Sequence, residues 1–241
     1  MSEDILIAHR DIWKKKPILK MLYTQWYEQM ASHLVTGHTL EIGGGSGNLK
    51  EFAPNVVCTD IVKVPWLDAV ADAQALPFAN NSFSNIVLFD VLHHIENPVF
   101  FFDEAMRILV PGGRIVIMDP YVSWASWPIY HFLHPEPVDF RQNPLDIQEY
   151  DKNRKPFDSN QAMSRLLFEK MQVAFKQRFP KLRVYYKRHL SFIVYPLSGG
   201  FDHPSLLPAA WAPSLLRFER LFEPLGRVFA FRVLLILEVM P

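Results

Sequence analysis

The feature that most constrains the fold is a short apolar run followed by closely spaced glycines, Thr39-Leu40-Glu41-Ile42-Gly43-Gly44-Gly45-Ser46-Gly47-Asn48-Leu49. It predicts a strand that stops abruptly and turns into a helix near Asn48, because glycine permits a tight turn and leaves the main chain bare for a ligand. A dinucleotide-binding loop has the spacing Gly-x-Gly-x-x-Gly, and here Asn48 takes the place of the third glycine. A glycine-rich turn without a ligand is the alternative interpretation.

The composition indicates one domain in which positive and negative charges balance. The chain has 241 residues, of which 49% are hydrophobic, and 25 basic residues balance 25 acidic ones. We therefore expect a single unit spanning residues 1–241, with no attraction to nucleic acid. The single cysteine, Cys58, excludes an intramolecular disulfide and fits a reducing compartment.

The two ends of the chain give no targeting or membrane signal. The N-terminus is acidic at Glu3 and Asp4 and reaches three lysines at 14–16 before any long apolar segment, which is the wrong order for a secretory signal. The apolar run at 231–239 is much shorter than the ~20 residues that a spanning helix needs. These features predict a cytoplasmic protein without a transmembrane segment.

Strand and helix patterns alternate along the chain. Residues 17–35 and 159–175 have apolar side chains at helical spacing, and a last helix, interrupted at Pro224, is expected over residues 215–225. Apolar runs at 55–60 and 85–90 read as the second and fourth strands, buried and each ending in an acid, and a third strand is expected between them over 67–71. The carboxylate of Asp60 would face the same crevice as the glycine loop, where it can accept two hydrogen bonds from a ribose diol. A surface aspartate that merely ends a strand is the alternative.

Several motifs in order resemble a known family. Glu41-x-Gly43-x-Gly45-x-Gly47 resembles motif I of the class I S-adenosylmethionine (SAM) dependent methyltransferases, and residues 71–78 are similar to the D-A-x-x-L-P-F segment of the type 11 methyltransferases. The passage from Phe89 to Asp119 resembles the pattern F-D-V-L-H-H … R-x-L-x-P-G-G-x-x-x-x-x-D-P of the same family. The resemblance is dense from residue 40 to residue 120 and fades beyond it.

The resemblance implies a fold and a cofactor. The fold would be α/β, a doubly wound, Rossmann-like sheet of seven mainly parallel strands with the last one antiparallel and helices on both faces. The cofactor would be SAM, with S-adenosylhomocysteine as product. The residues that the resemblance assigns to the cofactor are Glu41, Gly43, Gly44, Gly45, Gly47, Asp60, Ile61, Asp72, Ala73, Phe89 and Asp90.

Two histidines are the candidate catalytic residues. His93 and His94 follow the fourth predicted strand and would lie next to the methyl group, and an imidazole has a pKa suited to removing a proton from an acceptor. The alternative is that one of the two only binds backbone around the cofactor.

Residues 121–160 are expected to form a substrate lid, and residues 1–36 an N-terminal helical cover. The lid segment is rich in aromatic residues and proline, which is typical of functional loops, and Tyr130, His131 and His134 are its candidate substrate residues. A metal site at His131 and His134 is the competing interpretation. Pro135 argues for a break in the helix there, so no metal is expected.

The predicted function is therefore transfer of a methyl group from SAM to a small, partly apolar acceptor by direct in-line displacement. The sequence Asp90-Val91-Leu92-His93 replaces the Asp/Asn-Pro-Pro-Tyr of enzymes that methylate the amines of adenine or glutamine, which disfavours that chemistry. The alternative function is a non-catalytic SAM-binding sensor or partner subunit.

Overall fold

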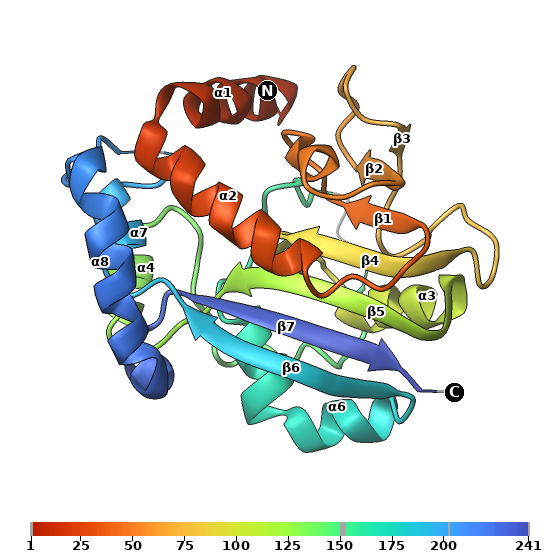
Figure 1. Cartoon of the computed structure of the whole chain (residues 1–241). Coiled ribbons are helices and arrows are strands. Elements are labelled where there is room, and N and C mark those ends of the chain that lie inside the picture. Colours follow the sequence, from red (N-terminus) through yellow and green to blue (C-terminus); the bar gives the residue numbers. More distant parts are fainter. Residues whose placement is uncertain (1, 150–152, 202, 241) are drawn as a thin grey trace.

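The computed structural model of the chain describes residues 2–149, 153–201 and 203–240. Within these residues, seven strands form one sheet in the order β3-β2-β1-β4-β5-β7-β6 (Figure 1). Neighbouring strands are parallel except at β7, which is antiparallel to β5 and β6. This confirms the expected topology. The strands are β1 (Thr39–Ile42), β2 (Val56–Asp60), β3 (Ala69–Val70), β4 (Phe83–Phe89), β5 (Leu109–Pro120), β6 (Leu182–Leu190) and β7 (Arg232–Val239).

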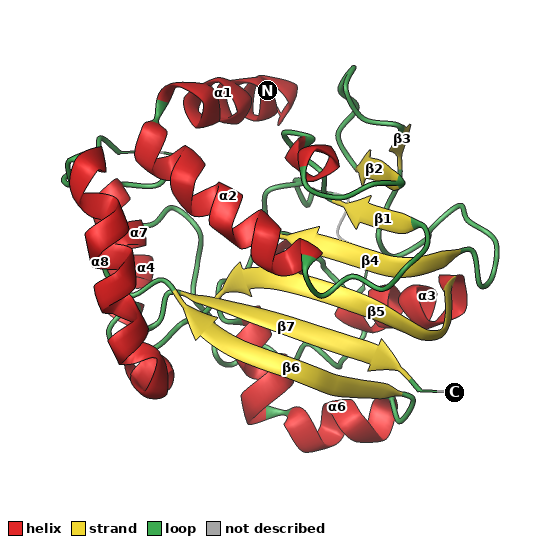
Figure 2. Cartoon of the chain, viewed as in Figure 1, coloured by secondary structure: helices red, strands yellow, loops and turns green. Residues whose placement is uncertain are grey.

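Helices cover both faces of the sheet (Figure 2). The α-helices are α1 (Ser2–Lys15), α2 (Pro17–Ala31), α3 (Pro98–Ile108), α4 (Trp127–Phe132), α5 (Met163–Arg165), α6 (Gln172–Arg178), α7 (Val194–Ser198), α8 (Ala212–Glu219) and α9 (Gly226–Phe229). Short 3-10 helices are η1 (Asn48–Glu51), η2 (Leu92–His94), η4 (Ala209–Trp211) and η5 (Arg220–Leu225), and η3 (Leu166–Lys170) is a π-helical turn. Core residues of α2, α7 and α8 pack on one face, and those of α3, α5 and α6 on the other.

The alternation of side chains along β4 shows why both faces need a cover. Ile86 and Leu88 belong to the core on the α3 side, whereas Val87 and Phe89 belong to the core on the α2 side. Successive side chains of a strand point to opposite faces, so an uninterrupted apolar strand is stable only between two layers. The predicted stripe of α2, which includes Trp26, fills the second of these cores.

Some predicted elements are shorter or broken in the structure. The helix predicted over 17–35 ends at Ala31, and the third strand, predicted over 67–71, is reduced to Ala69–Val70. The helix predicted over 159–175 is divided by the π-helical turn η3. A proline lacks the backbone N–H that continues a helix, and the final helix accordingly changes to 3-10 geometry around Pro224.

The strand order reverses beside β1, and this positions the glycine loop. β1 pairs with β2 on one side and with β4 on the other, so the carboxyl ends of all three strands lie at one edge of the sheet. The loop turns there with Gly43 at φ 65°, close to the segment that follows β4. A Cβ atom on Gly43 would lie only 2.2 Å from Cγ2 of Val91.

A buried ion pair links the last strand to the end of β4. Arg232 of β7 is 2% exposed, and its guanidinium forms a bidentate pair with the carboxylate of Asp90, with 2.9 Å between Nη2 and Oδ2. The guanidinium also lies 4.5 Å from the ring centre of Trp26 and 4.6 Å from that of Tyr195. Asp90 has φ 57°, a left-handed conformation that is uncommon for residues other than glycine, although aspartate and asparagine adopt it more readily than most. The ion pair therefore stabilises a sharp change of chain direction after β4.

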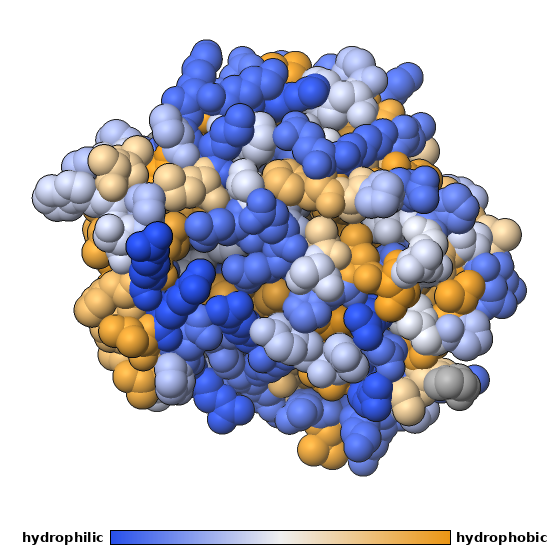
Figure 3. Space-filling model, viewed as in Figure 1, coloured by the Kyte–Doolittle hydropathy of each residue, from blue (hydrophilic) through white to orange (hydrophobic). Residues whose placement is uncertain are grey.

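Apolar side chains gather on the surface over α8 and η5 (Figure 3). Phe218, Leu221 and Leu225 are 47%, 72% and 49% exposed, although Glu219 between them is turned inward and accepts a hydrogen bond from the backbone N–H of Val194. None of the described helices combines the length and the apolar character needed to cross a bilayer.

Asp90→Asn is expected to lower the free energy of unfolding by about 3 kcal/mol, because the Arg232 guanidinium is left buried without a countercharge. Urea titration without added ligand measures this difference. The control is Asp103→Asn at a surface pair with Arg178, where the two side chains are 41% and 45% exposed. That substitution should cost about 1 kcal/mol or less. Equal losses in the two variants would contradict the structural role of the buried pair.

Gly43→Ala is expected to destabilise the protein more than Gly112→Ala does. Both glycines have positive φ, at 65° and 78°, but a Cβ on Gly112 would meet no atom within 4 Å. The two variants share a backbone penalty of ~1–2 kcal/mol, and only Gly43→Ala adds an overpacking penalty of ~1–3 kcal/mol against Val91. Thermal or urea unfolding of the two variants gives the difference. Indistinguishable stabilities would mean that the loop does not depend on its contact with Val91.

Candidate functional site

The side chains of Trp66 and Arg10 cover the glycine loop between β1 and η1. The indole Nε1 of Trp66 donates a hydrogen bond of 2.8 Å to the carbonyl oxygen of Gly45, and the guanidinium of Arg10 in α1 lies 4.5 Å from the indole ring centre. A side chain on Gly47 would collide with Trp66 at 2.9 Å. Trp66 could not be predicted as part of the site, because a single tryptophan after a proline belongs to no periodic pattern in the sequence.

Glu41 lies beneath the loop and is buried. The thiol of Cys58 donates a hydrogen bond of 2.7 Å to Oε2 of Glu41. Burial raises the pKa of the Glu41 carboxyl to about 7, in spite of that hydrogen bond and the more distant Lys50. A group with this pKa changes its charge near neutral pH.

Asp60 connects β2 to the glycine loop. Its Oδ2 accepts a hydrogen bond of 3.0 Å from the backbone N–H of Gly45, and its Oδ1 accepts one of 2.8 Å from the N–H of Val62. Burial raises the pKa of Asp60, although these backbone hydrogen bonds oppose the shift. A carboxylate has about four acceptor positions, so hydrogen-bonding capacity remains for a ligand. The neighbouring Ile61 is 52% exposed and offers a free apolar surface beside this carboxylate.

The other predicted cofactor residues divide into two groups. Asp72 and Ala73 follow β3, close to Asp60, since the N–H of Ala71 donates to the Asp60 carbonyl at 3.0 Å. Phe89 stacks on Tyr23 at 5.0 Å inside the core. In one group, Phe89 and Asp90 contact other side chains of the protein, Tyr23 and Arg232 respectively. In the other, the glycine loop, Asp60 and Ile61 lie together with Glu41 at one edge of the sheet.

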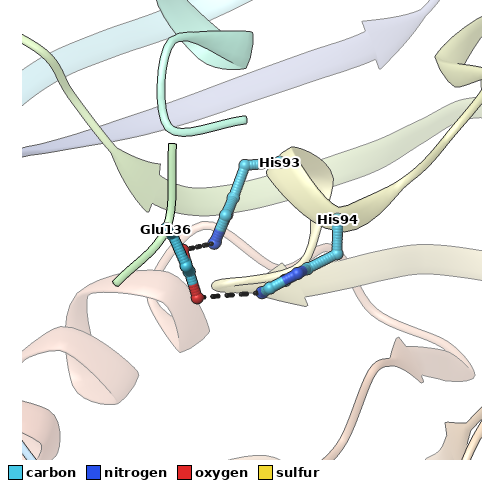
Figure 4. Close-up of side chains that lie close together, drawn as sticks. All are labelled: His93, His94 and Glu136. Atoms are coloured by element: carbon cyan, nitrogen blue, oxygen red, sulfur yellow. Dashed lines mark ion pairs between the residues drawn. The ribbon is translucent and has the colours of Figure 1, made fainter. Parts of the chain in front are cut away.

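The two candidate catalytic histidines meet an acid from a distant segment. Figure 4 shows Glu136, which follows α4, beside both imidazoles of η2. Nε2 of His93 lies 3.3 Å from Oε2 of Glu136, and Nε2 of His94 lies 3.8 Å from Oε1. On its other side, Nδ1 of His93 lies 2.8 Å from Oδ1 of Asp119 at the end of β5. Oδ2 of Asp119 accepts a hydrogen bond of 2.7 Å from Ser164.

The electrostatics of this cluster separate the two imidazoles. Burial lowers the pKa of His93, but Asp119 and Glu136 outweigh this effect and raise it to about 10. Burial and the positive charge of His93 lower the pKa of His94 to about 4. Burial raises the pKa of Glu136, but the hydrogen bond and charge of His93 prevail and lower it to about 2. Charged His93 and neutral His94 therefore lie side by side, with ring centres 4.1 Å apart.

The predicted substrate residues lie on or next to α4, but only one of them contacts the cluster. Tyr130 is buried and its hydroxyl donates a hydrogen bond of 2.7 Å to the carbonyl of Phe231. His131 is exposed and stacks on Trp127. Nδ1 of His134 accepts a hydrogen bond of 3.3 Å from the N–H of Glu136. Residues 150–152 of the expected lid lie outside the described residues.

Glu136 and Asp119 were absent from the predicted site residues. Asp119 ends a buried strand, which is the same signal that singled out Asp60, so the sequence carried the information needed to find it. Glu136 lies between two prolines in an irregular segment, where no periodicity indicates which side chains turn inward.

The stability contributed by Glu41 is expected to decrease as the pH rises. Burial raises its pKa from the usual 4.5 to about 7, so between these values the folded state retains the proton that the unfolded state loses. Relative to Glu41→Gln, the wild-type free energy of unfolding should fall by ~2–3 kcal/mol between pH 5 and pH 8. Urea titrations of both proteins at the two pH values measure this change. A difference that does not vary with pH would show that the buried carboxyl titrates normally.

Known proteins have sequences similar to part of the chain. A family profile described as "Methyltransferase domain" matches residues 40–117. The uncharacterized protein MJ1123 of Methanocaldococcus jannaschii is 30% identical over 106 residues, which are 41% of this chain and 52% of that protein. The ubiquinone/menaquinone biosynthesis C-methyltransferase UbiE of Cereibacter sphaeroides is 32% identical over 69 residues, which are 26% of this chain and 27% of UbiE. The chain thus spans about half, or less, of these relatives.

Solved structures with the same fold cover most of the chain. Geranyl diphosphate C-methyltransferase from Streptomyces coelicolor A3(2) aligns with a TM-score of 0.52 and 13% identity, over 95% of this chain and 84% of that one. A putative sarcosine dimethylglycine methyltransferase from Galdieria sulphuraria aligns with a TM-score of 0.51 and 12% identity, over 92% and 87%. At this identity the likeness concerns the fold alone. The match over residues 40–117 shows that this stretch of the chain is similar to the methyltransferase domain family, in agreement with the resemblance of the same residues to the type 11 methyltransferases.

Proposed function

We propose that the protein transfers a methyl group from SAM to a small, partly apolar acceptor, in a cytoplasmic setting. The observation that carries the proposal is the meeting of the glycine loop, Asp60 and Ile61 at the edge where the strand order reverses. In open α/β sheets, ligands bind at this edge. Buried, reduced Cys58 fits the compartment.

The geometry suits a nucleoside without a phosphate. The loop leads into η1, a 3-10 helix of only 4 residues, which offers little of the dipole that binds a pyrophosphate. Asp60 would accept hydrogen bonds from the ribose hydroxyls, and Ile61 would pack against the adenine. The Streptomyces neighbour was solved with S-adenosyl-L-homocysteine.

The histidine cluster lies on the acceptor side of this site. Gly43 touches Val91, and the N–H of His94 donates to the carbonyl of Val91 at 2.9 Å, so the loop and the cluster are adjacent. In the reaction, a lone pair of the acceptor forms a bond to the methyl carbon while the C–S bond breaks and its electrons stay on sulfur. A proton on the acceptor leaves to a base or to solvent. Holding the acceptor in line supplies much of the rate, on the order of 7–11 kcal/mol in good intramolecular models.

The segment that contributes Glu136 also supports an apolar acceptor. Trp124 and Phe132 of this segment are 77% and 70% exposed. Exposed aromatic side chains in the segment that supplies Glu136 are suited to contacting an apolar molecule. The balanced charge of the chain supports a small molecule rather than a nucleic acid as substrate.

A non-catalytic SAM-binding sensor or partner subunit is the alternative function. Such a protein would need the cofactor residues but no polar cluster beside the methyl group. The ordered contacts of His93, His94 and Glu136 favour the enzyme, because a charged buried cluster is costly unless it serves a purpose.

Calorimetry with SAM and with NAD tests cofactor binding. Asp60→Ala should weaken SAM binding by ~1.5–3 kcal/mol, or roughly 10- to 100-fold in Kd, because a charged acceptor of the ribose is lost. Asp103→Ala, an acid on α3 outside the site, is the control and should change the affinity by less than ~0.5 kcal/mol. Binding of NAD instead of SAM, or an unchanged affinity in Asp60→Ala, would contradict the cofactor assignment.

An assay of S-adenosylhomocysteine release in the presence of each of a panel of small apolar acceptors then distinguishes an enzyme from a sensor. Release should require an acceptor, and His94→Ala should slow it by on the order of a hundredfold or more if this side chain handles the acceptor's proton or position. Tight SAM binding with no acceptor-dependent release across the panel would favour the sensor.

A further inference from the structure

Three potential metal ligands converge beside the glycine loop. Nε2 of His93, Nε2 of His94 and the carboxylate of Glu136 all lie within 4.8 Å of one another (Figure 4). These ligands come from η2 and from the segment after α4. They do not include His131 or His134, at which the sequence predicts no metal site.

The spacing of the three groups fits a transition-metal ion. Zinc binds imidazole nitrogen and carboxylate oxygen at ~2.0–2.2 Å, so two such ligands at a tetrahedral angle lie ~3.3–3.6 Å apart. The observed separations from Glu136 oxygens are 3.3 Å for His93 and 3.8 Å for His94. All three ligand separations are within 4.8 Å, so those that exceed this range would shorten by up to ~1.5 Å when one ion is bound.

Both imidazoles are oriented by oxygen atoms behind them. Nδ1 of His93 lies 2.8 Å from Asp119, and Nδ1 of His94 lies 3.4 Å from the carbonyl oxygen of Asp158. An N–H at Nδ1 that faces an oxygen leaves Nε2 as the nitrogen that can bind a metal, and Nε2 of each ring faces Glu136. His93 is charged in the metal-free protein, so the ion would displace the proton from its Nε2. Metal-binding histidines almost always have such an outer partner, and a carboxylate is a common one.

Residues around Glu136 complete the outer shell. The amide nitrogen of Gln161 donates a hydrogen bond to Oε2 of Glu136, and Gln161 is 1% exposed. The amide oxygen of the same side chain is buried without a hydrogen-bond partner. A buried acceptor that lacks a donor costs free energy unless a ligand or water satisfies it. The cluster therefore has unused acceptor capacity next to its carboxylate.

The ligand set indicates the class of ion. Two imidazoles and one carboxylate suit Zn²⁺, Fe²⁺ or Co²⁺, whereas Mg²⁺ and Ca²⁺ prefer oxygen ligands alone. The side chains of His94 and Glu136 are 18% and 23% exposed, so one side of the cluster is open. Three protein ligands with an open position are typical of catalytic rather than structural metal sites.

We propose that His93, His94 and Glu136 bind one divalent transition-metal ion, and that the open position receives an oxygen atom of the methyl acceptor. Metal binding is inferred from the cluster alone, whereas binding of the acceptor to the ion rests on the proposed methyl transfer. The ion would fix the acceptor oxygen beside the cofactor and stabilise negative charge on it. The acceptor class is then a small molecule with a hydroxyl, enol or carboxylate oxygen.

Titration of the chelator-treated 241-residue chain with Co²⁺ and Zn²⁺ tests the site. We expect one equivalent of Co²⁺ to give visible d–d absorption bands, which Zn²⁺ removes by displacement. His94→Ala and Glu136→Gln should each weaken binding on the order of tenfold or more, and Asp119→Asn, which acts through His93, should weaken it by ~10- to 100-fold. His38→Ala is the matched control, because His38 is an exposed histidine outside the cluster, and it should bind metal as the wild type does.

SAM calorimetry on the same samples shows that each variant is folded and separates the two proposals. Metal binding without SAM binding would overturn the methyl-transfer proposal and leave the metal site standing. SAM binding by a protein that binds no Co²⁺ or Zn²⁺ would overturn the metal site alone. Metal binding that survives both His94→Ala and Glu136→Gln would place the ion elsewhere and also overturn the site.

Discussion

The buried ion pair between Arg232 and Asp90 is the interaction on which the site depends. A guanidinium that is 2% exposed is tolerated only with a countercharge, and here the four rings of Tyr23, Trp26, Phe89 and Tyr195 surround it as well. The pair holds Asp90 in a left-handed conformation, which redirects the chain after β4. This turn places Val91 against Gly43 and carries His93 to Asp119.

The two halves of the proposed site come from different parts of the sheet. The proposed cofactor half is built on the carboxyl ends of β1 and β2, where Asp60 accepts a hydrogen bond from the main chain of the glycine loop. The proposed acceptor half is built on the ends of β4 and β5, and Glu136 joins it from outside the region that matches the family profile. The choice of acceptor is therefore expected to depend on the segment around Glu136.

The electrostatic design differs between the halves. Beneath the glycine loop, burial keeps Glu41 near the midpoint of its titration at neutral pH, so this carboxyl carries only part of a negative charge. In the acceptor half, the charges of His93, Asp119 and Glu136 compensate one another in a buried network. The carboxylates of such a buried network need hydrogen-bond donors, and Gln161 and Ser164 each donate one, to Glu136 and to Asp119 respectively.

Local chemistry allowed the sequence to determine the sheet, the glycine loop and the strand-ending acid Asp60. Apolar periodicity, glycine spacing and the residue after a strand are all properties of neighbouring positions, and the family resemblance covered the same stretch. Only the tertiary structure decided which distant residues meet. Asp90 and Arg232 are 142 positions apart, and His93 and Asp119 are 26 apart. Trp66 and Glu136 reached the site through loops, whose course follows from packing against the finished sheet and leaves no periodic trace in the sequence.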